Sequence, residues 1–321
     1  MWSTCKIIYK SLIHNSGWRV SSLKVCLHSI SYAGLFYEGR HVPLKEMIPK
    51  AAEMGYEGVE VTAKRPLASP LDVKGKKAKE IKELADSYGI ELPLIAAYAD
   101  LTNPDPLDRE KELLYAVECI RMAEEMESPI VRFYGGGDKV YEEVPFRQQW
   151  EWAKEGLRFL AEVAEDRGIK IALEPHTSVV QTHEDALDMV EQIGSDNVGI
   201  CLDPPLLAIH REPVEKAVRA VGRLLLHAHV MDFVRKPVLV KYHAMPGLAV
   251  TEFTPIQDVP LGEGEVDLET FIRTASEVGY EGHLSYEVCV PFHIRHRMPT
   301  LQDVDRMTRH AAQYLRRLLG K

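Results

Sequence analysis

The sequence has no apolar run long enough to cross a bilayer, which takes about 20 residues, so we expect no membrane-spanning segment. It also has no surplus of basic residues, because 39 Lys and Arg stand against 48 Asp and Glu, for a net charge of −9. This acidic balance argues against a bulk electrostatic grip on nucleic acid, although it leaves a local basic groove open.

Cysteine is scarce, and its spacing does not match the common metal and redox patterns. The sequence has no CxxC pair, and the number of cysteines is odd. The five are Cys5, Cys26, Cys119, Cys201 and Cys289. We interpret them as free, buried thiols of a cytoplasmic protein, because a reducing cytosol disfavours disulfides. A cysteine nucleophile is the lesser alternative, since Cys201 and Cys289 fall on predicted strands, where packing explains them better.

The first 23 residues contain no acidic side chain and lack the features of a secretory signal, namely an apolar core and a small-residue cleavage site. They carry Lys6, Lys10 and Arg19. We expect residues 1–23 to form a loosely ordered extension and residues 24–321 to form the folded domain. A targeting role for the extension is the alternative.

From residue 24 onward the chain repeats a strand-and-helix unit of about 30 to 40 residues. In each unit a short apolar run precedes an amphipathic helical pattern. The expected strands are 25–29, 58–62, 92–97, 130–134, 169–174, 198–202, 224–230 and 283–288. Eight strands alternating with eight helices predict a single α/β domain, a closed (β/α)8 TIM barrel, with an open doubly wound sheet as the alternative. Residues 233–266 form a long predicted loop, the kind that shapes substrate sites.

Acidic and imidazole side chains stand at the ends of four of these strands. The fifth strand reads IALEPH, which puts Glu174 and His176 at its carboxyl end. The later strands contribute Asp203, His227, His229 and Glu287. In a TIM barrel the carboxyl ends of all strands meet at one mouth, where active sites lie. We therefore expect these side chains to converge.

Three carboxylates and a histidine in one mouth predict a divalent-metal site. Without a cation the carboxylates would repel one another, and at least one pKa would rise. A mixed oxygen and nitrogen ligand set suits Mn²⁺, Mg²⁺ or Co²⁺, with Zn²⁺ also open. We expect one divalent ion, with Mn²⁺ first among these. Each residue taken singly is better explained as a loop ion pair or a hydrogen-bonded core side chain, so the prediction depends on their coincidence.

Six segments carry a resemblance to a known family, and the resemblance covers essentially everything from Lys24 to Leu319. In chain order they read GYEGVEV, ALEPH, CLDP, HAHVMDF, PLGEGEVDL and GYEGHLSYEV. Together they resemble the xylose isomerase-like TIM barrel superfamily, and within it the sugar phosphate isomerase/epimerase branch. The segment PLGEGEVDL and the order of acidic and histidine residues are fairly specific for the superfamily, but they say little about the substrate.

The resemblance implies which residues hold the metal. The implied ligands are Glu174, Asp203, His229 and Glu287. His229 is implied rather than His227, because the ligand histidine of the family opens an HxxD segment, here ending at Asp232. Asp232 is in turn implied to support a ligand or to contact the substrate. One departure is Leu206, which stands where the family often has a second histidine.

The resemblance also implies a metal-dependent sugar isomerase or epimerase. The ion would polarise a carbonyl and a neighbouring hydroxyl, and Glu174, His176 or Glu287 would remove a proton from the carbon next to that carbonyl. Reprotonation of the metal-stabilised enediolate gives isomerisation or epimerisation; alternatively, Glu174 and Glu287 serve only as ligands. We expect Glu60 and Arg132, on the second and fourth strands, to contact the substrate, although Arg132 could instead pair with a carboxylate inside the barrel.

Three other functions stay open. Enzymes that cleave oxidised C-glycosides also carry a glutamate–x–histidine on this strand, here Glu174 and His176, and work with a small β-sheet partner subunit. The alternative for His176 is a loop histidine bonded to a backbone carbonyl. The second function is that of apurinic endonucleases, which resemble this barrel but have several metal ions held by histidines and a basic surface. The third is a non-catalytic barrel that works only with a partner subunit. We expect a carbohydrate substrate, no nucleic acid or membrane partner, and either a homo-oligomer or a small partner subunit.

Overall fold

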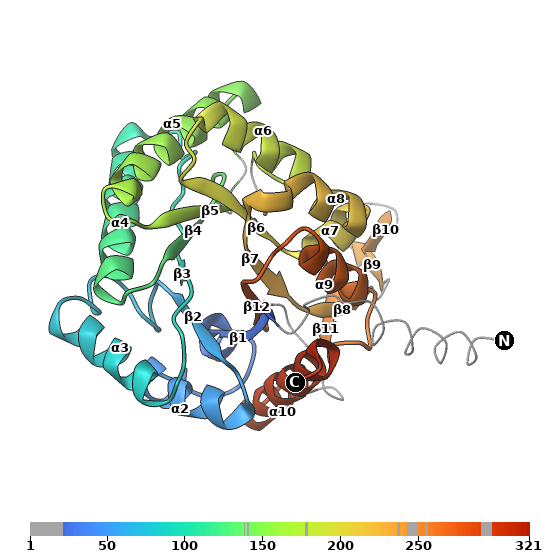
Figure 1. Ribbon diagram of the computed structural model, residues 1–321. Coiled ribbons are helices and arrows are strands. Elements are labelled where there is room, and N and C mark those ends of the chain that lie inside the picture. Colours follow the sequence, from blue (N-terminus) through green and yellow to red (C-terminus); the bar gives the residue numbers. More distant parts are fainter. Residues whose placement is uncertain are drawn as a thin grey trace.

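The computed structural model describes residues 22–137, 139, 141–176, 179–235, 238–242, 249–253, 256–289 and 297–321. Residues 1–21, most of the predicted extension, lie outside the described residues. Eight parallel strands close into a barrel in the order β1-β12-β7-β6-β5-β4-β3-β2. Figure 1 looks into this barrel and shows the helices around its outside. The prediction of a single (β/α)8 TIM barrel is confirmed.

The barrel strands are short and mostly buried. They are β1 (Lys24–His28), β2 (Gly58–Thr62), β3 (Ile95–Ala96), β4 (Ile130–Tyr134), β5 (Lys170–Glu174), β6 (Val198–Leu202), β7 (Leu225–Val230) and β12 (His283–Tyr286). The main difference from the prediction is β3, which was expected over residues 92–97. Pro93 explains the shorter strand, because its nitrogen carries no hydrogen for the sheet.

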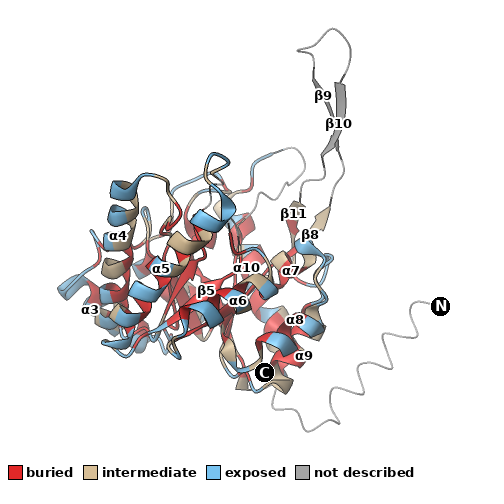
Figure 2. Cartoon of the chain, turned by 90° about the horizontal axis from the view of Figure 1, so that it is seen from above, coloured by how far each residue is buried: buried red, intermediate tan, exposed pale blue. Residues whose placement is uncertain are grey.

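The helices cover the outside of the barrel, and Figure 2 shows the buried residues gathered inside them. They are α2 (Leu44–Met54), α3 (Lys76–Ser87), α4 (Pro106–Glu125), α5 (Phe146–Glu165), α6 (His183–Ile193), α7 (Pro204–His210), α8 (Val214–Val221), α9 (Leu268–Glu277) and α10 (Leu301–Leu319). Short 3₁₀ helices occupy Ser29–Tyr32 and Gly222–Leu224. None of the helices in the described residues is both long and apolar enough to cross a membrane.

Local sequence signals set the helix ends, as α6 shows. The Thr182 hydroxyl accepts the N–H of Asp185, and the Asp185 carboxylate accepts the N–H of Thr182. This reciprocal capping satisfies two backbone donors at the start of the helix. Gly194 ends α6 with a φ of 71°, a left-handed conformation that glycine adopts without steric penalty. These two signals therefore fix where α6 begins and ends.

The long connection after β7 contains strands that the sequence did not predict. They are β8 (Asp232–Arg235), β9 (Val238–Tyr242), β10 (Ala249–Phe253) and β11 (Ile256–Val259). β8 pairs antiparallel with β11, and β9 pairs antiparallel with β10. Because β8 follows β7 almost directly, the β8–β11 pair stands at the carboxyl end of the barrel, beside the predicted site.

Candidate active site

The four predicted metal ligands meet at the carboxyl ends of neighbouring strands. Glu174 ends β5, Asp203 follows β6, His229 lies near the end of β7, and Glu287 follows β12. Ligand atoms of Asp203, His229 and Glu287 lie within 4.8 Å of one another. Glu174 Oε1 lies 3.2 Å from His229 Nδ1, and all four residues are buried. The structure therefore brings these side chains into one group, and their role as ligands stays a prediction.

This group is short of positive charge. Burial, followed by Glu287 and Glu174, raises the pKa of Asp203 well above its ordinary value. The buried Oδ1 of Asp203 has no hydrogen-bond partner among the described residues. Burial opposes a charge on His229, but Cys201 and the surrounding carboxylates outweigh it and raise the pKa of the ring. A divalent cation would give Asp203 Oδ1 a partner and balance the charge of the three carboxylates, so the residues present fit a metal ion.

Arg132 forms an ion pair with Glu174. Arg132 Nε lies 2.9 Å from Glu174 Oε2, and Nη1 donates to a backbone carbonyl at 3.1 Å. The guanidinium lies 4.7 Å from the ring centroid of Tyr98 and 4.2 Å from that of Tyr134. Burial opposes ionisation of Glu174, but His229 and Arg132 outweigh it and lower the pKa of Glu174 to about 2. Glu174 is therefore ionised at neutral pH, while substrate contact by Arg132 stays a prediction.

His176 follows β5 and Pro175 and is half-buried. Its ring stacks on Tyr134, with the centroids 4.4 Å apart. Its Nδ1 is buried and has no hydrogen-bond partner in the part of the chain that the structure describes. The stacking holds the ring while leaving one nitrogen open, which a general base requires. The catalytic role of His176 stays a prediction.

Three histidine rings, those of His28, His227 and His229, surround the buried carboxylate of Glu60 in β2. Glu60 Oε1 lies 3.1 Å from His229 Nε2, and Oε2 lies 2.9 Å from His227 Nε2. His28, the last residue of β1, places Nε2 3.3 Å from Glu60 Oε1 and Nδ1 2.8 Å from Glu287 Oε2. Glu60 is 0% exposed. The predicted substrate contact of Glu60 would therefore require access to a fully buried carboxylate.

His28 was not predicted as a site residue, although a usable signal was present. It ends the first strand just as Glu174 ends the fifth, and the register pairs His28 with Glu60 on the neighbouring strand. A polar residue at the carboxyl end of a barrel strand is expected to lie at the mouth of the barrel, and this holds for β1 as much as for β5.

Asp232 directs its carboxylate toward its own loop. It accepts the backbone N–H groups of Phe233, Gly262, Gly264 and Val266 at 2.8 to 3.1 Å. Gly264 is required by this approach, because a Cβ there would lie 2.1 Å from Asp232 Oδ1. Asp232 therefore ties the PLGEGEVDL segment to the end of β7, and a substrate contact by this residue stays a prediction.

The cysteines within the described residues are packed rather than activated. Cys26, Cys119 and Cys201 are buried, and Cys289 is partly buried. Burial raises the pKa of Cys201 to about 12, whereas a nucleophilic thiol needs a lowered pKa. Cys5 lies outside the described residues.

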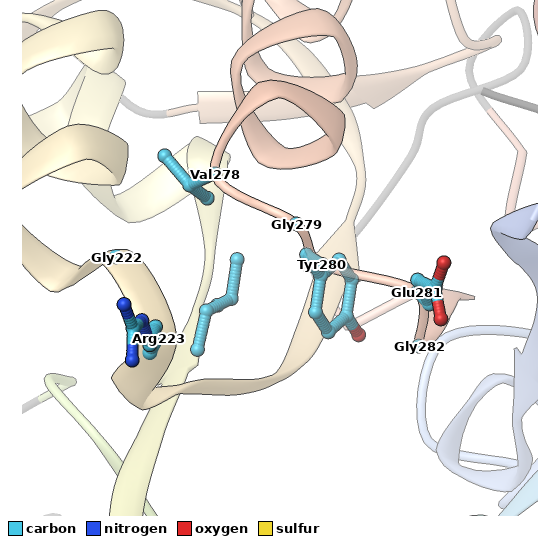
Figure 3. A pocket seen from close by; sticks show the side chains of 8 residues that line it. Gly222, Arg223, Val278, Gly279, Tyr280, Glu281 and Gly282 are labelled. Atoms are coloured by element: carbon cyan, nitrogen blue, oxygen red, sulfur yellow. The ribbon is translucent and has the colours of Figure 1, made fainter. Parts of the chain in front are cut away.

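A separate cavity of about 320 Å³ lies at the opposite end of the barrel (Figure 3). Its lining comes from the segments that lead into β7 and β12: Gly222, Arg223, Leu225, Val278, Gly279, Tyr280, Glu281 and Gly282. These residues stand at the amino ends of the strands, away from the four predicted metal ligands. The chemistry of TIM barrels lies at the carboxyl ends, so we place the candidate site there.

Comparisons with known proteins are consistent with this geometry. A family model described as xylose isomerase-like TIM barrel matches residues 48–318. A fructoselysine 3-epimerase from Escherichia coli O157:H7 is 27% identical over 284 residues, covering 85% of this chain and 96% of that protein. A crystal structure of D-psicose 3-epimerase in the presence of D-fructose shares the fold, with a TM-score of 0.73, 18% identity and coverage of 93% of this chain and 100% of that one.

A metal-bearing protein is among the solved structures with this fold. A crystal structure of IOLI protein with a bound zinc atom has a TM-score of 0.70 and 18% identity, covering 93% of this chain and 98% of that one. At such low identity these structures support the fold alone. The family model, however, spans most of the sequence, from the first barrel helix to the last. This chain belongs to the xylose isomerase-like TIM barrel family.

Proposed function

We propose that this protein is a divalent-metal-dependent sugar epimerase or isomerase, which moves a proton at the carbon next to a carbonyl. The observation that carries the proposal is the buried group of Glu174, Asp203, His229 and Glu287, in which one Asp203 oxygen has no partner among the described residues. The similarity to a fructoselysine 3-epimerase over almost its entire length supports a sugar with a carbonyl group as the substrate.

Four side chains would hold the ion: Glu174, Asp203, His229 and Glu287. When bound there, a divalent ion supplies Lewis-acid polarisation of the carbonyl oxygen and its neighbouring hydroxyl. We propose Mn²⁺ because three carboxylates and one imidazole make a hard set with one borderline ligand. Co²⁺, Mg²⁺ and Zn²⁺ are the other ions to test.

We propose that two carboxylates, those of Glu174 and Glu287, exchange protons with the substrate. Glu174 belongs to β5 and Glu287 follows β12, and these strands are separated in the barrel by β6 and β7. The two groups therefore enter the site from different sides. In an epimerisation, one would remove the proton from one face of the carbon and the other would return a proton to the opposite face. His229 and Arg132 lower the pKa of Glu174 and hold it ionised, which is the form that can accept a proton.

Solvent exchange tests this function directly. The full chain, loaded with Mn²⁺, is incubated with a panel of ketoses in D₂O, and deuterium at the carbon next to the carbonyl is followed by NMR. We expect enzyme-dependent exchange with at least one ketose, and none with Glu174→Gln or Glu287→Gln. Glu91→Gln, an exposed carboxylate at the opposite end of the barrel, is the matched control. Metal-loaded protein that exchanges no ketose would overturn the proposal.

A second candidate function is cleavage of oxidised C-glycosides by the same proton abstraction. The observation that favours it is His176, which follows Glu174 at the glutamate–x–histidine spacing and keeps a buried Nδ1 without a partner among the described residues. Release of the aglycone from an oxidised C-glycoside, followed by chromatography, would support this candidate. We would also look for a small chain that co-purifies with the full-length protein. Exchange with ketoses but no aglycone release would reject it.

A further inference from the structure

We infer that Glu60 and His28 are positioning residues, which fix the ring nitrogen that His229 presents and the orientation of the Glu287 carboxylate. This inference rests on the proposed function, because it assumes that His229 and Glu287 hold the ion. It goes beyond the proposed function by assigning a role to two buried polar residues, His28 of β1 and Glu60 of β2, which take no part in the proposed proton transfer.

Glu60 determines which nitrogen of His229 is available. An ionised carboxylate can only accept hydrogen bonds, so the nitrogen that faces it must carry a hydrogen. Glu60 Oε1 lies 3.1 Å from Nε2 of His229, and the other ring nitrogen, Nδ1, lies 3.2 Å from Glu174 Oε1. Nε2 therefore keeps its hydrogen, and Nδ1, beside the predicted ligand Glu174, is the nitrogen at which a metal ion would replace the hydrogen. Carboxylates that accept from the far nitrogen of a ligand histidine orient the ring in this way.

Glu60 is itself held in place. Its second oxygen, Oε2, lies 2.9 Å from His227 Nε2, which must also donate. Both oxygens are thus engaged by imidazoles, and the side chain is 0% exposed. A substrate molecule does not reach such a group without displacing a partner. This burial favours action through His229 over direct contact with the sugar.

His28 bonds directly to Glu287. Its Nδ1 lies 2.8 Å from Glu287 Oε2. Because an ionised carboxylate can only accept, Nδ1 carries a hydrogen and donates it to Glu287. The other ring nitrogen, Nε2, lies 3.3 Å from both Thr62 Oγ1 and Glu60 Oε1. Contacts on both nitrogens therefore orient the His28 ring, and with it the Glu287 carboxylate.

The two contacts act on two different predicted ligands, from the same side. His28 and Glu60 lie opposite each other in the register of the neighbouring strands β1 and β2. Replacing a buried ionic network by apolar residues of similar size is often neutral or stabilising. Positioning of the ligands, rather than stability, is therefore the expected benefit of this network.

Metal affinity measured by titration calorimetry of the metal-free full chain with Mn²⁺ tests the inference without any substrate. Glu60→Leu and His28→Leu remove the contacts, and each should weaken binding by about 10- to 100-fold, the usual loss for such outer partners. Glu60→Gln keeps an acceptor for His229, and His28→Asn keeps a donor near the position of Nδ1. Both should recover much of the affinity. Glu91→Gln should bind as the wild type does.

The outcomes separate this inference from the proposed function. Wild-type protein that binds no Mn²⁺ would overturn both together. Wild-type binding with unchanged affinity in folded Leu variants, checked by circular dichroism, would overturn the inference alone. If a Leu variant does not fold, the conservative variants carry the test. Mn²⁺ affinity equal to that of the wild type in Glu60→Gln and His28→Asn, together with a raised KM for a ketose in Glu60→Gln, would assign Glu60 a substrate contact and overturn the inference. Weakened affinity in the Leu variants with recovery in the conservative ones supports positioning.

Discussion

Replacing Arg132 with leucine should destabilise the metal-free protein strongly, because it leaves a buried carboxylate unpaired. The side chain of Arg132 is 1% exposed and that of Glu174 is 2% exposed, and Arg132 Nε lies 2.9 Å from Glu174 Oε2. Removing one partner of a buried ion pair typically costs about 3–5 kcal/mol. The lost stacking of the guanidinium on Tyr98 and Tyr134 adds to this cost. We expect Arg132→Leu to lower the free energy of unfolding by about 3–5 kcal/mol.

Guanidinium chloride unfolding at pH 7, followed by circular dichroism, measures this loss. Arg132→Lys is the matched control, since it keeps the charge but loses the planar group that stacks, and it should lose less. A second test adds Mn²⁺, which should narrow the gap between Arg132→Leu and wild type, because the ion would neutralise Glu174 in place of the arginine. A loss below about 1 kcal/mol, the range of an exposed pair, would refute the reasoning.

Two further predictions concern Asp203 and Asp232. Burial, Glu287 and Glu174 raise the pKa of Asp203. Above about pH 4 the unfolded chain releases the Asp203 proton, whereas the folded protein keeps it. The free energy of unfolding of the wild type therefore falls as the pH rises above about 4. Metal-free Asp203→Asn should therefore gain stability over wild type between pH 4 and 8 in urea unfolding; a difference that does not vary with pH would contradict this. Asp232→Ala leaves four backbone N–H groups without their acceptor, each worth about 1 kcal/mol or more, so residues 233–266 should be cleaved faster in limited proteolysis followed by mass spectrometry. Equal cleavage rates in Asp232→Ala and wild type would show that the carboxylate does not hold the loop.

The barrel could be predicted from the sequence because each of its units carries independent signals. Buried strands such as Val198–Leu202 read as continuous apolar runs, and α6 is bounded by a capping threonine and a terminal glycine. Local patterns of this kind do not depend on distant residues. The grouping of Glu174, Asp203, His229 and Glu287 then follows from one rule, that the carboxyl ends of barrel strands meet.

Features that depend on distant contacts could not be predicted in the same way. β8 pairs with β11 although residues 236–255 separate the two strands in the sequence, so no short-range turn signal links them. Three of the four backbone groups whose hydrogen bonds Asp232 accepts lie 30 to 34 residues further along the chain. Glu60 and His28 look like ordinary strand residues until the barrel closes. Their roles emerge only when β1 and β2 are placed beside β7 and β12.

Metal content tests the central claim most directly. The full chain and Glu287→Gln are purified, soaked with Mn²⁺, desalted and analysed by inductively coupled plasma mass spectrometry. We expect about one divalent ion per wild-type chain and a loss of that ion in the variant, because Glu287 would supply one of four ligands. Wild-type protein without metal after soaking, or a variant that retains as much metal as wild type, would contradict a metal centre at the strand ends.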